Sequence, residues 1–276
     1  MLGGMTEPLS QAHDFRAESE ALFALLADQP DAVFALETQF KAWSINDVIG
    51  HLYLWNWAAR LSLIDPEGFQ AFLKEMGAAF RSAGSWRAFE RGWVKGLAGQ
   101  PLLAAWRADM DETAEAFAAA DPKARLAWVG PPMSARSSIT ARMMETWAHA
   151  QAVFDRLGVE RVEQDRLINV AQLGVNTFGW TFQNRAETPP GPAPEVRLTA
   201  PSGAVWRWNE GAPGLVEGPA VAFCQIVTQT RAAADTAIRT EGETAARWMA
   251  IAQCFAGPPN DPPAPGARFR SPAALA

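Results

Sequence analysis

The chain has 276 residues, of which 49% are hydrophobic, and its formal net charge is -6. This length suffices for one large folded domain or two smaller ones. Because no concentrated basic surface is evident to neutralise phosphates, we do not expect nucleic acid as a partner. No uncharged apolar run is long enough to cross a bilayer, so we do not expect a membrane partner either.

The first ten residues, MLGGMTEPLS, lack the basic and apolar regions of a signal peptide. Cys224 and Cys254 show no CxxC pattern and suggest no disulfide framework. These features predict a cytoplasmic protein with two reduced, buried thiols.

The first two-thirds of the chain predict helices separated by short breaks. Apolar residues at helical spacing predict a helix over 9–29, and the sequence SIND at Ser44 resembles a capping box that starts a helix ending near Ile64. Further helices are expected over 66–82, 85–99, 101–120, 139–158 and 161–185, with a loop over 123–138. Several long helices with modest connections indicate an up-and-down bundle.

The character of the sequence changes at 187–195, ETPPGPAPE, where closely spaced prolines cannot continue a helix. Two strands, EVRLTA and AVWRWN, are expected after it, joined by a turn at PSG, followed by a short strand, a helix and the final helix GETAARWMAIAQCF. The predicted fold class is α plus α+β. It comprises a helical bundle (1–186), a proline-rich linker (187–194), a small α+β domain (195–257) and a proline-rich tail (258–276).

Glu145 and His149 lie four residues apart in the predicted helix 139–158, so their side chains share one face. A carboxylate and an imidazole at this spacing can bind the same divalent ion, and His51 on another helix could supply a third ligand. Three protein ligands leave a coordination position open for water or substrate. The same spacing also fits solvent-exposed side chains, because Glu145 and His149 lie roughly 135° from the centre of the helix's apolar stripe.

Two motifs, WSINDVIGHL (43–52) and MSARSSITARMMETWAHAQAVFDRLG (133–158), resemble the DinB-like metalloprotein superfamily. The resemblance is strongest to the branch that includes mycothiol-dependent maleylpyruvate isomerase, and it covers most of residues 9–185. It implies a helical bundle whose metal ion is bound by His51, Glu145 and His149. That branch commonly has an acidic residue where this chain has Ala152. We therefore expect a residue other than 152 to orient the His149 ring.

Near the C-terminus, the segments GPAVAFCQIVTQ and EGETAARWMAIAQCFAGPP resemble a small α+β domain related to sterol-carrier-type folds. A similar domain has been labelled after wyosine base formation in tRNA. We do not transfer that activity to this acidic chain, because it lacks an evident tRNA-binding surface.

The resemblance implies an enzyme of the low-molecular-weight-thiol-dependent transferase or isomerase type, in which a metal-bound thiolate attacks an electrophilic substrate. Two alternatives stay open. One is a metal-dependent hydrolase that uses a metal-bound hydroxide, and the other is a non-enzymatic binder of an apolar ligand with a structural metal. The expected cofactors are one divalent ion and a low-molecular-weight thiol. Zinc is the first expectation for the ion, although nickel, iron and manganese accept the same ligands.

Arg136 and Arg142 flank the start of the predicted metal-binding helix and could pair with a substrate carboxylate, because Arg suits bidentate contacts. The alternative is that both are solvated charges on an exposed helix face. The expected partner of the protein is a small-molecule substrate, and a homodimer is left open.

Overall fold

The computed structural model describes residues 9–272, apart from the side chains of residues 80–83. The chain divides into two compact units, Met1–Val153 and Phe154–Ala276, and the division falls inside helix α6 (Ala135–Leu157). Within the described residues, none of the helices is both long enough and apolar enough to span a membrane.

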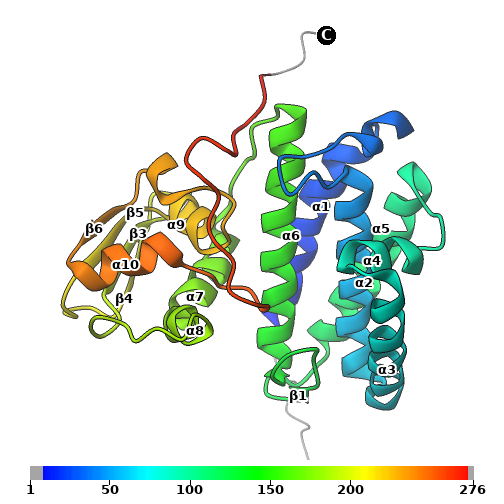
Figure 1. Cartoon of the computed structure of the whole chain (residues 1–276), viewed down its shortest axis with the longest axis horizontal. Helices are drawn as coiled ribbons and strands as arrows, with labels where there is room; N and C mark the ends of the chain where they lie inside the picture. The colour runs from blue at the N-terminus through cyan, green and yellow to red at the C-terminus, as the bar shows by residue number, and fades with distance from the viewer. Residues whose placement is uncertain (1–8, 273–276) are drawn as a thin grey trace, which may run out of the picture. The chain divides into compact units, whose positions relative to one another are not determined.

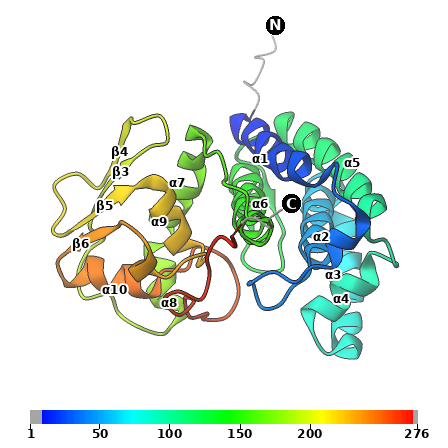
Figure 2. The same ribbon diagram turned by 90° about the horizontal axis from the view of Figure 1, so that it is seen from above.

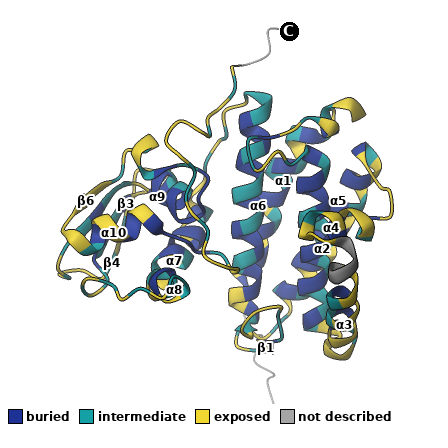
Figure 3. Ribbon diagram, in the orientation of Figure 1, coloured by how far each residue is buried: buried dark blue, intermediate teal, exposed yellow. Residues whose placement is uncertain are grey.

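The first unit is a helical bundle in which α1, α2, α5 and α6 run alongside one another (Figures 1 and 2). Before α6, its elements are α1 (Ser10–Leu26), η1 (Asp31–Ala35), α2 (Ile45–Ile64), α3 (Pro66–Ala83), α4 (Trp86–Trp93), α5 (Gly99–Ala118) and the two-stranded ladder β1 (Arg125–Leu126) and β2 (Met133–Ser134). Buried positions line the sides of α2 and α6 (Figure 3). Large aromatic side chains fill the core, among them Phe15, Trp106, Phe117 and Trp147.

Two serine caps fix the helices that matter for the site. The predicted capping box at the start of α2 is present, since Asp47 N donates to Ser44 Oγ at 3.1 Å and Ser44 N donates to Asp47 Oδ2 at 2.9 Å. Helix α6 begins earlier than predicted, at Ala135. There Ser134 Oγ accepts a hydrogen bond from Ser137 N at 3.1 Å and thereby satisfies an otherwise unpaired donor of the first turn.

The second unit combines a four-stranded sheet with short helices. After the end of α6 come η2 (Asp165–Leu167), α7 (Ile168–Asn176), α8 (Phe178–Asn184), β3 (Glu195–Thr199), β4 (Val205–Trp208), β5 (Leu215–Pro219), α9 (Ala220–Val227), η3 (Ala233–Asp235), β6 (Arg239–Glu241) and α10 (Glu243–Ile251). The strand order is β4-β3-β5-β6, in which β3 and β5 are parallel and the other pairs are antiparallel. Helix α9 packs on β3 and β5 (Figure 2). The predicted fold class is confirmed.

The opposite face of this sheet carries a row of paired charges. Side chains alternate between the faces of a strand, so Val196 and Leu198 of β3 are buried while Arg197 between them is only half-buried. Arg197 pairs with Glu195 at 3.0 Å and with Glu217 of β5 at 2.9 Å. Arg207 and Arg239 extend the row at its two ends through the same two glutamates.

One predicted helix of this region differs from the structure. The helix expected over 161–185 is divided into η2, α7 and α8, and at the break Thr177 Oγ1 donates to the carbonyls of Leu173 and Gly174. Helix α7 packs against α9 and α8 packs against α10, so both belong to the second compact unit. The predicted domain bounds, with a linker at 187–194, stay a prediction.

Candidate metal centre

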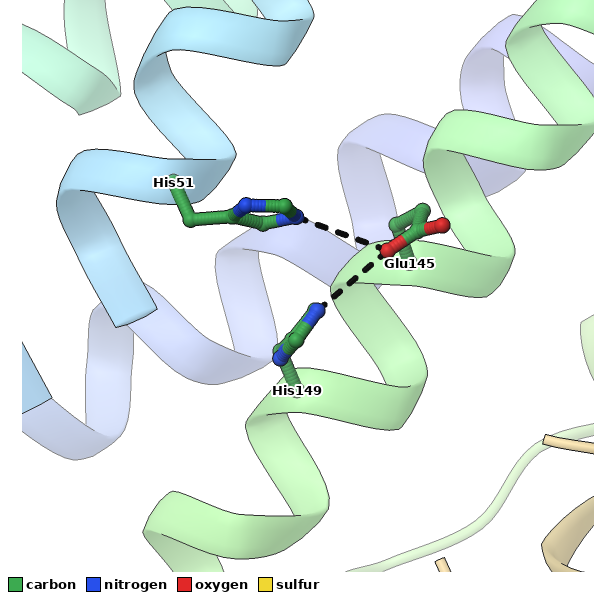
Figure 4. Close-up of side chains that lie close together, drawn as sticks. All are labelled: His51, Glu145 and His149. Carbon is green, nitrogen blue, oxygen red and sulfur yellow. Dashed lines mark ion pairs between the residues drawn. The ribbon is translucent and has the colours of Figure 1, made fainter. Parts of the chain in front are cut away.

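The three side chains predicted as metal ligands converge between α2 and α6 (Figure 4). One ligand atom from each of His51, Glu145 and His149 lies within 4.8 Å of the other two. Glu145 Oε2 is 3.5 Å from His51 Nε2 and 3.3 Å from His149 Nε2. The side chains are 15%, 20% and 11% exposed respectively, so the cluster is largely enclosed but is not sealed from solvent.

The residues present fit a divalent ion. His51 Nε2 is buried and, within the described residues, has no hydrogen-bond partner. Metal–ligand bonds of about 2.0–2.2 Å in tetrahedral geometry place ligand atoms about 3.4 Å apart, and the Glu145 oxygen lies 3.5 Å and 3.3 Å from the two imidazole nitrogens. Two imidazoles and one carboxylate form a donor set suited to zinc and neighbouring transition metals.

Glu90 of α4 holds the other nitrogen of His51. Its Oε1 lies 2.9 Å from His51 Nδ1 and accepts a hydrogen bond from Trp55 Nε1 at 2.8 Å. An ionised carboxylate can only accept, so His51 donates through Nδ1 and its Nε2 is directed toward Glu145. Glu90 is only 5% exposed and therefore forms part of the interior of the bundle.

The carboxylates around His51 change its protonation in the metal-free protein. Burial opposes the charged imidazole, but the charges of Glu90 and Glu145 outweigh burial and raise the pKa of His51 to about 9. For His149, burial dominates and the pKa lies below its usual value. Burial would raise the pKa of Glu145, but the nearby imidazoles of His149 and His51 hold it well below its usual value, so this carboxylate is ionised.

The sequence did not identify Glu90, because no spacing rule connects positions on two different helices. A local signal was present, since Glu90 lies on the same side of a short helix as Trp86, Phe89 and Trp93. A carboxylate among aromatic residues at helical spacing indicates a buried acid that needs a partner.

Asp47, one turn before His51, does not contact the cluster. Its carboxylate accepts from Arg91 Nε at 2.6 Å and Arg91 Nη2 at 2.8 Å in addition to capping α2. Burial opposes the charge of Asp47, yet the hydrogen bonds from Arg91 and Ser44 keep its pKa below the usual value. Asp47 therefore fixes the start of the helix that carries His51.

An aromatic wall from the segment before α2 packs against the histidines. The ring of Trp43 stacks on His149, with centroids 5.5 Å apart and planes 7° apart, and Phe40 meets the same ring edge-on at 4.9 Å. Between them, Lys41 and Ala42 have positive φ angles of 52° and 53°, which side-chain-bearing residues rarely adopt. The contacts of Trp43 and Phe40 restrict the His149 ring, and position 152, where related proteins commonly have an acidic residue, is Ala152 in this chain.

The two arginines predicted to bind substrate lie in different environments. Arg136 is exposed in the first turn of α6. Arg142 is 6% exposed, and its guanidinium lies over the ring of Trp128, 5.3 Å from the centroid. It is three residues before Glu145, so the two side chains are neighbours on one face of α6. Their role in substrate binding stays a prediction.

Comparison with known proteins gives the following matches. The sequence model of the family described as "Mycothiol maleylpyruvate isomerase N-terminal domain" matches residues 15–154. Two similar proteins are the uncharacterized protein Rv0036c of Mycobacterium tuberculosis strain ATCC 25618 / H37Rv and the uncharacterized protein MT0041 of strain CDC 1551 / Oshkosh. Each is 40% identical over 256 residues, covering 92% of this chain and 98% of the relative.

Among solved structures, the crystal structure of the mycothiol-dependent maleylpyruvate isomerase is similar, with a TM-score of 0.54 and 16% identity. The match covers 86% of this chain and 96% of that chain. A histidine-to-alanine mutant of that isomerase matches over the same shares of both chains with a TM-score of 0.53. These structures share the fold, and with the family match they confirm the resemblance indicated by the two motifs.

Proposed function

This chain belongs to the mycothiol maleylpyruvate isomerase N-terminal domain family, and on that premise we propose that it is a metal-dependent enzyme that uses a low-molecular-weight thiol. One observation carries the proposal. His51, Glu145 and His149 bring three ligand atoms within 4.8 Å of one another, and none of the three side chains is more than 20% exposed.

His51, Glu145 and His149 would hold one divalent ion, with zinc as the first candidate. The ion would supply Lewis acidity, which lowers the pKa of a thiol at its open position so that the thiolate acts as nucleophile toward an electrophilic carbon. The chain supplies one carboxylate and two imidazoles, which leaves the centre positively charged and suited to stabilising an anionic sulfur.

The surrounding residues position the ligands. Glu90 accepts a hydrogen bond from His51 Nδ1, which makes Nε2 the nitrogen that would coordinate the ion. Trp43 and Phe40 restrict the His149 ring and limit the water that reaches it. A preorganised and largely dry site strengthens the electrostatic interactions on which thiolate formation depends.

The substrate would be a small electrophile, and the reaction a transfer or isomerisation that begins with addition of sulfur. The relative of known structure is named as a mycothiol-dependent isomerase. At 16% identity that likeness extends to the fold, so the thiol and the electrophile of this chain are parts of the proposal.

Elemental analysis of the purified protein tests the metal-binding part of this proposal. We expect about one equivalent of metal per chain in the wild type, and a loss of most of it in Glu145→Ala and His149→Ala. The matched control is His13→Ala, because His13 is exposed and lies outside the cluster. Full metal content in Glu145→Ala would contradict the proposed ligand set.

The thiol part is tested with Co²⁺ in place of the native ion. Addition of a low-molecular-weight thiol should produce an intense near-ultraviolet sulfur-to-cobalt absorption band, and the band should be absent in His51→Ala. An unchanged cobalt spectrum at saturating thiol, combined with thiol-independent turnover of an ester or amide, would favour the hydrolase alternative.

A further inference from the structure

Arg142 is a buried cation whose interactions leave part of its guanidinium unsatisfied. Within the described part of the chain, Nη1 is buried and has no hydrogen-bond partner. The residue is only 6% exposed, and its interactions there are with the ring of Trp128 and the charge of Glu145. Burial lowers the pKa of Arg142 despite the attraction of Glu145. A buried charge without a hydrogen-bonding partner is costly, and it is usually found paired.

Two other enclosed arginines of the described chain are paired with carboxylates. Arg60 meets Asp109 at 2.7 Å in the first unit, and Arg231 meets Asp155 at 2.7 Å in the second. Arg142 differs from both, because the charge that acts on it, Glu145, is one of the proposed metal ligands. An ion at the cluster would share the charge of Glu145 and reduce its attraction for Arg142.

The surroundings of Arg142 determine which part of its guanidinium is covered. Trp128 lies against it, and that indole is itself fixed by stacking on Phe69 (6.0 Å, 5°) and by an edge contact with Trp55 (5.8 Å). A cation–π contact with an indole uses none of the N–H groups of a guanidinium as hydrogen-bond donors to oxygen, so they stay available for hydrogen bonding. A planar carboxylate matches that edge, since it can accept two parallel N–H bonds.

The charge of Arg142 itself indicates the kind of ligand. A dication held by Glu145 and two neutral imidazoles has one excess positive charge, which a bound thiolate would balance. The guanidinium of Arg142 is a separate positive charge with an unsatisfied Nη1. A single guanidinium suits one monoanionic group better than a phosphate dianion, which generally collects several donors and cations.

We propose that Arg142 is the anion-binding residue of this centre and receives a carboxylate of the electrophilic substrate while the ion holds the thiol. The assignment rests on the proposed function. It makes Arg142 a specificity-determining residue that orients the electrophile from one turn of α6 away from Glu145. Arg136, which is exposed at the start of the same helix, has no part in this contact.

The test compares an anionic and a neutral probe of the same shape, butyrate and butyramide, on the zinc-loaded full-length protein. Dissociation constants are measured by ligand-observed NMR for the wild type, Arg142→Gln, Arg142→Lys and the control Arg136→Gln. The preference is the ratio of the dissociation constant for butyramide to that for butyrate, and we expect it to exceed one in the wild type and in Arg136→Gln. In Arg142→Gln this ratio should be lower by about tenfold or more, which corresponds to the loss of a charge-assisted pair. The ratio for Arg142→Lys should lie between those of the wild type and Arg142→Gln.

Zinc content and thermal unfolding are measured on the same samples. Arg142→Gln should keep its zinc, because Arg142 is not a ligand, and this separates the assignment from the proposed function. If the wild type binds no zinc, the proposed function fails, and the preference is then compared on metal-free wild type and variants. If Arg142→Gln does not fold, the assignment is tested by comparing butyrate and butyramide binding in Arg142→Lys with that in the wild type.

The assignment is overturned if the butyrate preference is the same in the wild type and in the folded Arg142 variants, or if the wild type shows no preference. Inorganic phosphate provides a further arm. It should not displace butyrate at equal concentration, and tighter binding of phosphate that depends on Arg142 would overturn the choice of a carboxylate.

Discussion

One charged region in each unit illustrates a different use of charged side chains. In the α+β unit, arginines and carboxylates neutralise one another in the row across the open face of the sheet and in the enclosed pair of Arg231 and Asp155. In the helical unit, where pairs such as Arg60 and Asp109 are also present, His51 Nε2 and Arg142 Nη1 are buried and make no hydrogen bond within the described residues.

This difference separates structural charges from those available for chemistry. A paired charge is already satisfied and contributes through the geometry that it fixes. A buried polar atom without a partner lowers the stability of the fold, and such atoms concentrate where a ligand completes them. We therefore assign the activity to the cluster of His51, Glu145 and His149. We assign a structural role to the ion pairs of the second unit.

The largest effect is expected from breaking the buried pair of the second unit. Asp155 is 4% exposed, so Asp155→Asn would leave the charge of Arg231 without compensation. The free energy of unfolding should fall by about 3–5 kcal/mol in urea denaturation. The control is Asp261→Asn, whose exposed ion pair with Arg185 should contribute about 1 kcal/mol or less. Similar losses in the two variants would contradict the distinction between buried and exposed pairs.

The protonation of His51 predicts a pH dependence in the metal-free protein. Its pKa is raised to about 9 in the folded state, so the charged form stabilises the fold. That contribution is fully present below the unfolded value of about 6.5 and is lost as the pH rises through about 9, amounting to about 3 kcal/mol. Thermal unfolding after chelation should show a falling midpoint across this range. In Glu90→Gln the midpoint of unfolding should fall less steeply with pH. A fall as steep as in the wild type would show that the pair of His51 and Glu90 does not cause the pH dependence.

Glu90→Gln also tests the positioning of a metal ligand. The amide can still contact His51 but loses the charge that fixes its tautomer, so the dissociation constant for Zn²⁺ should rise about 10–100-fold. Competition with a chromophoric chelator measures it. Glu67→Gln, an exposed glutamate on α3, should leave zinc affinity unchanged. An unaltered affinity in Glu90→Gln would mean that the contact with His51 is only structural.

The smallest effect is expected at Arg142. Replacing it by Met removes an incompletely satisfied buried charge but retains an apolar stem against Trp128, so the free energy of unfolding should change by about 1 kcal/mol or less, or increase. Urea denaturation of the metal-free protein measures this. A loss comparable to that of Asp155→Asn would show that Arg142 is a structural cation after all.

The sequence predicted the parts of the molecule that local patterns encode. The Ser44 capping box, the four-residue spacing of Glu145 and His149, and the turn at PSG between β3 and β4 each depend on residues close together in the chain. Helix α6 begins before the predicted start because Ser134, which lies in the predicted loop, caps it. The apolar pattern does not reveal the break at Thr177, because such a pattern can continue through two short helices.

Local sequence patterns do not predict contacts between separate helices and loops. Nothing local connects Glu90 to His51 or Trp128 to Arg142. A single apolar stripe also underestimated the burial of α6, which has buried residues around most of its circumference, so Glu145 and His149 are mostly enclosed instead of facing solvent. The motifs named the candidate ligands, and the fold identified the residues that position them.

The most direct test of the proposed centre is anomalous diffraction at the absorption edge of the bound metal, measured on crystals of the purified protein. A single strong peak is expected about 2.0–2.2 Å from His51 Nε2, His149 Nε2 and a Glu145 carboxylate oxygen, with at least one further position occupied by solvent or thiol. A metal peak elsewhere, or no peak at this cluster in crystals grown with added zinc, would contradict the account.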